Sequence, residues 1–211
     1  MEVWVSTLSD ALERALQRED PYIEGIVADD EDLDLPLDLT FFEFHNMELN
    51  HCALRGIQAR KASFYGCTLR GCDLSGAQLN EAFLSRTRLI DCKLEGVQLA
   101  KSFWRSSHLE GCLCRYANLG ESKFENARIA NCDFREAFLS EVQFRSRTRL
   151  EHCALVRADL FRTSLKGMDL SSCDIAAITV SDAHSELRGM RISREQAIDL
   201  VGMLGVEVID G

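Results

Sequence analysis

Large apolar residues recur at every fifth position over most of this 211-residue chain. The series runs over residues 39–144, passes one extra residue within 145–149, and continues over 150–180. Of its 29 positions, 27 hold a large apolar residue, and only Ala59 and Cys114 depart. Neither the helical period of 3.6 residues nor the strand period of two produces this pattern. A five-residue unit cannot bury its apolar face alone, so the chain must stack such units on one another.

A second period shows how many units make one coil. The residue two positions before each large one is Ala, Cys, Ser, Thr or Val at 23 of the 29 positions, so each unit sends one large and one small side chain inward. Seven of the nine cysteines occupy this small position in every fourth unit, with one extra residue after the fifth: Cys52, Cys72, Cys92, Cys112, Cys132, Cys153 and Cys173. Four units therefore close one coil. We predict an all-β solenoid of square section, a quadrilateral β-helix of about seven coils.

The flanks of the repeats are expected to cap the solenoid, because its ends would otherwise expose unpaired backbone and apolar core. We assign residues 1–36 to an acidic N-terminal extension with a short helix, 37–182 to the β-helix, and 183–211 to a C-terminal capping and dimerisation segment. Ser193 and Gln196 form a capping-box pattern that predicts a C-terminal helix. Apolar residues of this helix are candidates for a symmetric dimer contact: Ala197, Ile198, Leu200, Val201 and Leu204.

The charge of the chain is unevenly distributed. The net charge is −10 for the whole chain, and residues 1–40 alone, with twelve acids and two arginines, account for −10. Residues 41–182 carry +2 and residues 183–211 carry −2. The predicted coils are therefore close to neutral, and the acidic excess lies in the first fifth of the chain.

Composition excludes several classes of protein. No window approaches 18 uncharged apolar residues, so we expect no membrane-spanning helix. The N-terminus lacks the basic and apolar regions of a signal peptide, and an odd number of cysteines without a Cys-x-x-Cys pair favours a reduced, cytoplasmic protein. Cysteines in neighbouring coils would lie ~4.8 Å apart, which is close enough for disulfide bonds. We expect free thiols because the cytoplasm is reducing, and not because the geometry forbids disulfides.

We expect no metal, no cofactor and no enzymatic activity. In the pairs His51–Cys52 and His152–Cys153, the cysteine points inward and the histidine outward, so neither pair can chelate one ion. The acidic stretch 29–34 lacks the Gly and closing Glu of an EF-hand loop. The chain contains no phosphate-binding glycine loop and no G-x-S-x-G sequence.

Individual units carry a recognisable motif. Cys72–Gly76, Ala117–Glu121 and Ala158–Arg162 fit the pattern A(D/N)LXX, and the chain resembles the pentapeptide-repeat proteins over residues 37–182. The acidic N-terminal extension and the stretches 163–170 and 187–197 are similar to those of the Qnr-type proteins of Gram-positive bacteria.

The resemblance implies a right-handed coil, a dimer through the C-terminal helix, and a function. Proteins of this type bind DNA gyrase and topoisomerase IV by imitating duplex DNA, which protects both enzymes from quinolones. Two departures bear on this expectation. The coil lacks the projecting loops of the Gram-negative members, and a true imitation of duplex DNA ~34 Å long would need about 20 negative charges. The alternative is an interaction scaffold with no topoisomerase activity and no direct contact with nucleic acid.

Two surfaces are candidates for partner binding. At one corner, the same outward position in successive coils holds Glu81, Lys101, Glu121, Glu141, Arg162 and Asp182, with Asp159 nearby. This acidic stripe is either a contact for a basic groove or an ordinary solvated face of mixed charge. The outward side chains of Phe83 and Phe103 lie one coil apart, and they are expected to contact either a partner or the folded-back N-terminal segment.

Overall fold

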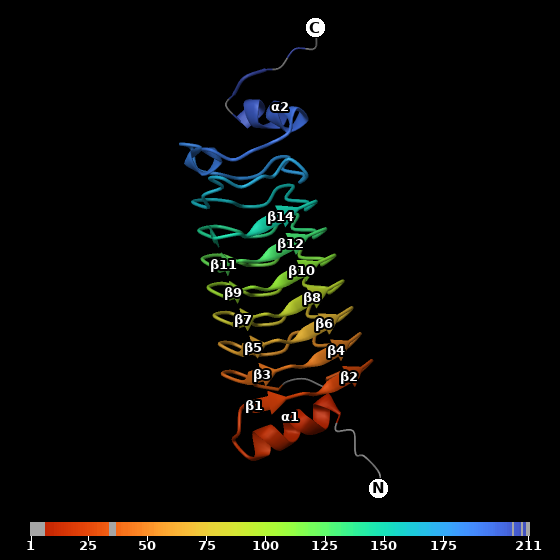
Figure 1. The fold of residues 1–211 in the computed structure, drawn as a ribbon. Helices are drawn as coiled ribbons and strands as arrows, with labels where there is room; N and C mark the ends of the chain where they lie inside the picture. Colours follow the sequence, from red (N-terminus) through yellow and green to blue (C-terminus); the bar gives the residue numbers. More distant parts are fainter. Residues whose placement is uncertain (1–6, 34–36, 204, 208, 210–211) are drawn as a thin grey trace.

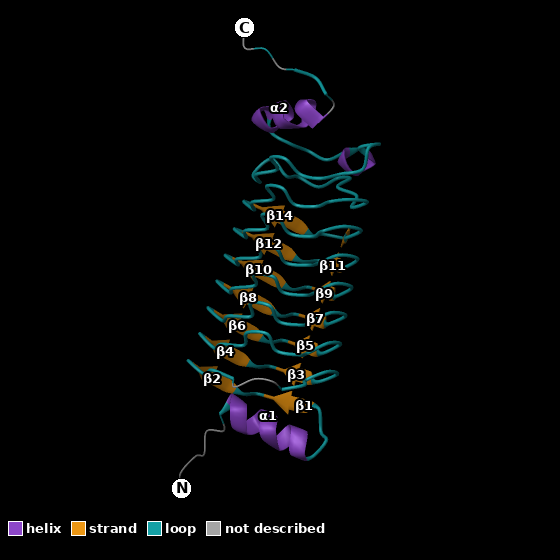
Figure 2. Cartoon of the chain, turned by 180° about the vertical axis from the view of Figure 1, so that it is seen from behind, coloured by secondary structure: helices purple, strands orange, loops and turns teal. Residues whose placement is uncertain are grey.

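The chain forms a single rod of stacked coils in a computed structural model that describes residues 7–33, 37–203, 205–207 and 209. The N-terminal helix α1 (Leu8–Gln17) and the C-terminal helix α2 (Arg194–Met203) lie at opposite ends of the rod (Figure 1). Short strands line two sides of the rod from its N-terminal end up to Glu151, and loops connect them (Figure 2). The predicted β-solenoid with a helix at each end is confirmed.

Two parallel sheets of seven strands each run along the rod. Each strand has three residues, and the central one is turned inward. The first sheet contains β1 (Tyr22–Glu24), β3 (Glu43–His45), β5 (Ser63–Tyr65), β7 (Phe83–Ser85), β9 (Phe103–Arg105), β11 (Lys123–Glu125) and β13 (Gln143–Arg145). The second contains β2 (Val27–Asp29), β4 (Glu48–Asn50), β6 (Thr68–Arg70), β8 (Arg88–Ile90), β10 (His108–Glu110), β12 (Arg128–Ala130) and β14 (Arg149–Glu151).

Two further ladders of isolated bridges complete the four sides. The third side joins Asp32, Ala53, Asp73, Lys93, Leu113, Asp133, Ala154 and Asp174 in succession. The fourth joins Asp38, Gln58, Gln78, Gln98, Asn118, Phe138, Asp159 and Thr179. Partners in the middle of the rod, such as Leu69↔Leu89, are separated by four five-residue units, so four units make one coil as the cysteine spacing predicts.

The sheets begin further toward the N-terminus than the repeat pattern indicates. β1 and β2 lie within residues 1–36 and pair with β3 and β4, with Ile23 opposite Phe44 and Ala28 opposite Leu49. These partners are one position further apart in the sequence than partners in the middle of the rod, because one extra residue lies between Leu33 and Leu39. Part of the segment that we set apart as an extension therefore forms a coil of its own.

The helices cover the two ends of the core. Leu8, Leu12 and Ala15 of α1 are buried among the inward side chains of the first coils. At the other end, the backbone N–H of Ser193 donates to Gln196 Oε1 at 2.7 Å and the N–H of Gln196 donates to Ser193 Oγ at 3.3 Å. The predicted capping box is thus present. Gln196 Nε2 also donates to the Leu170 carbonyl at 2.9 Å, which holds α2 against the last coil.

Candidate interaction surfaces

The predicted acidic stripe is a stack of alternating charges. Its residues occupy one corner of the rod with positive φ angles, from Lys61 to Arg162. Each acid approaches a base in the neighbouring coil, and the nitrogen–oxygen distances are 3.8 Å for Lys61–Glu81, 3.6 Å for Lys101–Glu121 and 3.5 Å for Arg162–Glu141. Exposed ion pairs of this kind contribute at most about 1 kcal/mol each. The carboxylates of Glu81, Glu121 and Glu141 are exposed, but a positively charged side chain next to each one offsets its negative charge.

The other two acids of the stripe lie elsewhere. Asp159 belongs to the fourth side, where it is half-buried and accepts hydrogen bonds from Ser140 Oγ at 2.6 Å and from the Phe161 N–H at 2.9 Å. Asp182 is exposed in the turn that follows the last bridge of that side. The structure therefore places Glu81, Glu121 and Glu141 on one corner. Asp159 lies beside this corner, bonded to Ser140, and Asp182 lies in the turn after the fourth side. Their role in binding stays a prediction.

Phe83 and Phe103 belong to a longer column of rings on the first sheet. Their ring centroids are 5.6 Å apart, and the Arg105 guanidinium lies 5.7 Å from the first ring and 5.1 Å from the second. Toward the N-terminus the column continues through Tyr65, His45 and Tyr22, at successive centroid distances of 5.5, 4.5 and 4.8 Å. The rings stabilise one another and the sheet.

The N-terminal segment does not cover Phe83 and Phe103 within residues 7–33. Helix α1 lies beyond β1, and β3 and β5 separate β1 from β7 in the first sheet (Figure 1). The expectation that this segment folds back over the two rings is therefore wrong for the part of it that the structure describes. A contact with a partner stays a prediction.

The sequence places the acidic excess in the first 40 residues, but it does not show that part of this charge forms a surface on the coils. Five exposed carboxylates lie on the first two coils, on the two sheets and the corner after β2: Glu24, Asp29, Asp30, Glu43 and Glu48. We call this surface the acidic end. Among the described residues, none of the five forms an ion pair with Lys or Arg, and the nearest bases are His45 and His51, at 3.3 Å from Glu43 and 4.0 Å from Asp30. The signal was present in the sequence, since no Lys or Arg occurs between Arg18 and Arg55.

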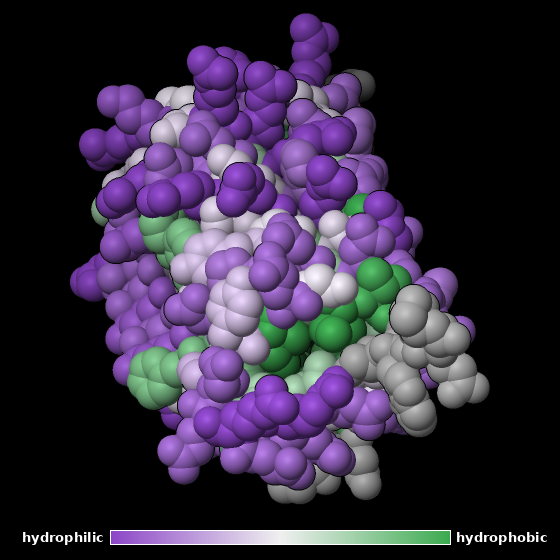
Figure 3. Space-filling view, turned by 60° about the horizontal axis from the view of Figure 1, so that its bottom comes forward, coloured by the Kyte–Doolittle hydropathy of each residue, from purple (hydrophilic) through white to green (hydrophobic). Residues whose placement is uncertain are grey.

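Neutral side chains hold part of the acidic end in place. Asn46 donates to Glu24 at 3.2 Å and Asn50 donates to Asp29 at 2.7 Å, each from the adjacent coil. The Tyr22 hydroxyl also donates to Glu24 at 2.8 Å, and this hydrogen bond raises the pKa of Tyr22. Figure 3 shows this end of the molecule, where hydrophilic residues surround an apolar area. The carboxylates are thus oriented without being neutralised.

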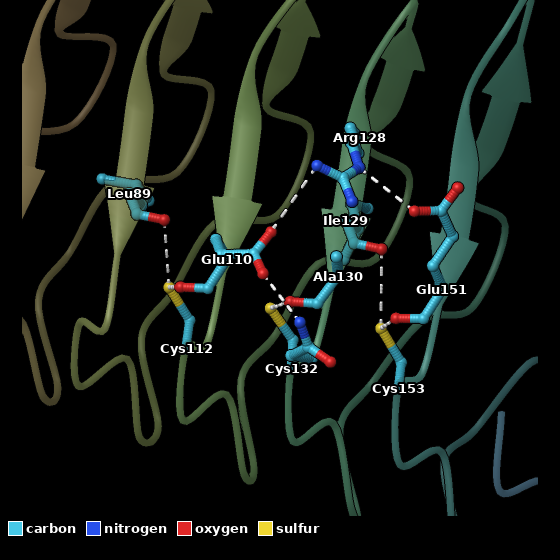
Figure 4. A network of polar contacts seen from close by, with 10 residues as sticks. Leu89, Glu110, Cys112, Arg128, Ile129, Ala130, Cys132, Glu151 and Cys153 are labelled. Atoms are coloured by element: carbon cyan, nitrogen blue, oxygen red, sulfur yellow. Dashed lines mark hydrogen bonds and ion pairs between the residues drawn. The ribbon is translucent and has the colours of Figure 1, made fainter. Parts of the chain in front are cut away.

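The cysteine ladder is part of the core. All nine cysteines are free thiols and all are buried. Seven of the nine Sγ atoms donate to backbone carbonyls of the preceding coil, as in Cys112 to Leu89 at 3.4 Å and Cys153 to Ile129 at 3.7 Å (Figure 4). Burial raises the pKa of Cys52 to about 11. Within the described residues, no three His, Cys, Asp or Glu side chains are grouped to hold a metal ion.

The proposed dimer residues lie on or next to α2. Ile198 is 57% exposed, whereas Ala197, Leu200 and Val201 are half-buried. Leu204 lies outside the described residues. No helix in the described ranges combines the length and apolar character needed to cross a bilayer.

These observations define the class of protein: a four-sided β-solenoid with a packed interior, built from five-residue repeats. Residues 42–119 match the family described as "Pentapeptide repeat region", and residues 106–145 match eight copies of "Pentapeptide repeats". The chain is a pentapeptide-repeat protein.

Comparison with solved structures finds proteins of low sequence identity. QnrB1, a plasmid-mediated fluoroquinolone resistance protein, is 16% identical with a TM-score of 0.37, and the match covers 90% of this chain and 100% of QnrB1. HetL, a pentapeptide-repeat protein involved in heterocyst differentiation regulation in the cyanobacterium Nostoc sp. strain PCC 7120, is 19% identical with a TM-score of 0.41, over 86% of this chain and 95% of HetL. The comparison with curated proteins finds no significant match.

Proposed function

We propose that this protein is a non-enzymatic binding rod whose acidic end occupies a DNA-binding surface of a type II topoisomerase, gyrase or topoisomerase IV. Binding there would compete with DNA and protect the enzyme from quinolones. The sequence resemblance to the Qnr-type proteins supplies the class of partner. It also implies a homodimer through α2 and a cytoplasmic location, where bacterial topoisomerases act.

The observation that carries the proposal is the charge density of the acidic end. Two coils span about 10 Å at ~4.8 Å per coil, and duplex DNA of that length carries about six negative charges. The acidic end presents five carboxylates over the same length. The rod as a whole cannot imitate duplex DNA, because its coils are close to neutral, but this end has the charge density that a basic DNA-binding groove recognises.

The experiment is DNA supercoiling by purified gyrase, with and without a quinolone, at increasing concentrations of the rod. The test variant combines Asp29→Asn, Asp30→Asn and Glu48→Gln, which remove three charges and keep the shapes of the side chains. Asn is well tolerated at the positive φ of position 30. The matched control combines Asp91→Asn, Glu95→Gln and Asp174→Asn, three exposed acids away from the acidic end.

We expect the test variant to need at least tenfold more protein for the same effect on gyrase, and the control to behave as the wild type. A third variant, with Gln at positions 81, 121 and 141, tests the corner stripe. Loss of the effect in this variant alone would assign binding to the stripe in place of the acidic end.

A second candidate function is a protein-interaction scaffold without topoisomerase activity. The compensated charge of the corner stripe and the absence of a projecting loop within 37–182 favour it. If the wild-type rod neither inhibits gyrase nor protects it from a quinolone, the scaffold function is the one that is supported.

A further inference from the structure

The stacking of coils is interrupted on two of the four sides near the C-terminal end. The coil of residues 163–171 follows β13 and β14, and Figure 1 shows that no strand lies beyond β14. On the third and fourth sides the ladders continue, through Ala154↔Asp174 and Asp159↔Thr179. On the two sheet sides, no backbone hydrogen bond joins β13 to residues 164–166 or β14 to residues 169–171, all of which the structure describes.

Regular stacking resumes one coil later. The Leu165 N–H donates to the Glu186 carbonyl at 2.9 Å, and the Arg191 N–H donates to the Met168 carbonyl at 2.8 Å. The break is therefore confined to one gap between two coils. It lies next to the extra residue within Arg145–Arg149, which widens the corner between β13 and β14.

The gap is a cleft of about 770 Å³. This volume lies within the range of about 300–1,000 Å³ that is typical of ligand sites. We call it the basic cleft. It is lined by apolar Phe144, Leu150 and Met168 and by the cationic side chains Arg147, Arg149 and Lys166.

The charges of the basic cleft are not compensated. Arg147, Arg149 and Lys166 are exposed, and none forms an ion pair with another described residue. The two carboxylates of the lining are already paired, Glu151 with Arg128 at 3.1 Å and Asp169 with Arg191 at 3.2 Å. The cleft thus carries three free positive charges over a lining of polar and apolar side chains.

The N-terminal half of β14 is an open sheet edge in the cleft. At its other end the Leu150 carbonyl accepts from Cys173 Sγ at 3.7 Å and the His152 N–H donates to Ser172 Oγ at 3.1 Å. In preceding coils, the carbonyls of Ser107 and Ala127 accept hydrogen bonds from the N–H groups of Arg128 and Arg149. The equivalent carbonyl of Thr148 receives no such bond from the described residues of the next coil. An open edge of this kind pairs readily with an extended chain.

We propose that the basic cleft binds an extended acidic segment of a partner protein. The segment adds to β14 as a short parallel or antiparallel strand, and its carboxylates contact Arg147, Arg149 and Lys166. Alternate side chains of a strand point in opposite directions, so one set faces the cations while the other covers Phe144 and Met168. Single-stranded nucleic acid fits less well, because it binds by stacking its bases on exposed aromatic rings, and the lining offers only the half-buried Phe144 and the imidazole of His152.

The test is fluorescence anisotropy with a labelled octapeptide of alternating threonine and glutamate. The charge variant combines Arg147→Gln, Arg149→Gln and Lys166→Gln. Its matched control combines Arg60→Gln, Arg88→Gln and Lys93→Gln, three exposed cations outside the cleft. A third variant deletes Ser146, which restores the five-residue spacing and keeps every cation, and we expect this deletion to close the cleft. Competitors are the same peptide with proline in place of each threonine, a single-stranded DNA dodecamer and inorganic phosphate.

We expect the charge variant and the deletion each to weaken peptide binding at least tenfold, and the control to weaken it less than threefold. The proline peptide should compete poorly, since it has lost the N–H groups that a strand donates. Equal binding by the deletion variant, or better competition by the DNA or phosphate, would overturn the proposal. The proposal would also be overturned if the peptide does not bind and the cleft is instead occupied by a second copy of this chain. The basic cleft and the acidic end lie at opposite ends of the rod, so this result is independent of the gyrase assay.

Discussion

The Glu31 carboxylate accepts a 2.9 Å hydrogen bond from the backbone N–H of Leu8, 23 residues away in the sequence. Its second oxygen accepts from the Ser9 N–H at 3.2 Å, and Thr7 Oγ1 accepts from the Asp10 N–H at 3.0 Å. The first N–H groups of α1, which have no partner within the helix, are thus satisfied. Because Glu31 lies in the first coil, this contact attaches the capping helix to the end of the solenoid.

Replacement of Glu31 by alanine should loosen α1 from the rod. Loss of a helix cap costs about 1 kcal/mol, and the negative charge at the helix N-terminus is lost as well. We expect faster amide exchange at Leu8 and Ser9 and a lower melting temperature. Glu13→Ala is the control, because Glu13 is an exposed carboxylate on the same helix. Equal exchange rates in the two variants would show that the cap does not hold the helix.

Glu186 should make the C-terminal end of the rod sensitive to acid. Its side chain is only 2% exposed and accepts hydrogen bonds from the Arg162 N–H at 2.8 Å and Ser181 Oγ at 2.8 Å. Burial would raise the pKa of this carboxyl, but hydrogen bonds from its own N–H, Ser181 and Arg162 outweigh burial and hold the pKa below its usual range. The stabilisation is therefore present above the usual glutamate pKa of about 4.3 and is lost as the pH falls through the lower value of the folded state.

Glu186→Gln is expected to destabilise the protein by about 1–3 kcal/mol at neutral pH, because an amide group would face donors that need an acceptor. The difference between wild type and variant should narrow in acid, where the wild-type carboxyl is itself protonated. Urea unfolding at a series of pH values measures this. A difference that does not change with pH would show that the carboxylate charge plays no part.

The thiol ladder should be chemically inert in the folded protein. The nine cysteines are at most 6% exposed, and burial raises the pKa of both Cys52 and Cys67. Since the thiolate is the reactive form, we expect no thiol to react with Ellman's reagent in the native state and all nine to react in denaturant. Rapid reaction of any native thiol would contradict the packing of the ladder.

The repeats themselves were predictable because each coil imposes the same burial on the same position. The first coil was hidden for a physical reason: one extra residue shifts its phase. Steps of five back from Leu39 reach Asp34, Asp29 and Glu24, which are all acidic, whereas the buried centres are Ile23, Ala28 and Leu33. A phase shift of one residue turns an inward position outward.

The surfaces were harder to predict than the core. Glu81, Glu121 and Glu141 share a corner as the period requires, but the sequence does not show that each lies within 3.8 Å of a base in a neighbouring coil. The extra residue near position 146 was visible in the sequence, but the cleft beside it was not. The five-residue spacing continues unchanged after Leu150, while the backbone of the next coil separates from β14.

The exposed apolar side chain of Ile198 on α2 leads to the last prediction. Ile198 is 57% exposed on a helix that caps the rod, and burying the exposed part of its side chain in a symmetric contact would stabilise a dimer by about 1–2 kcal/mol per copy. We expect the wild type to sediment as a dimer and Ile198→Asp to sediment as a monomer with an unchanged circular dichroism spectrum. Asp199→Ala changes the neighbouring exposed residue and should leave the dimer intact. A wild-type chain that is monomeric at high concentration would exclude α2 as a dimer contact. A variant that remains dimeric would place the contact elsewhere on the rod.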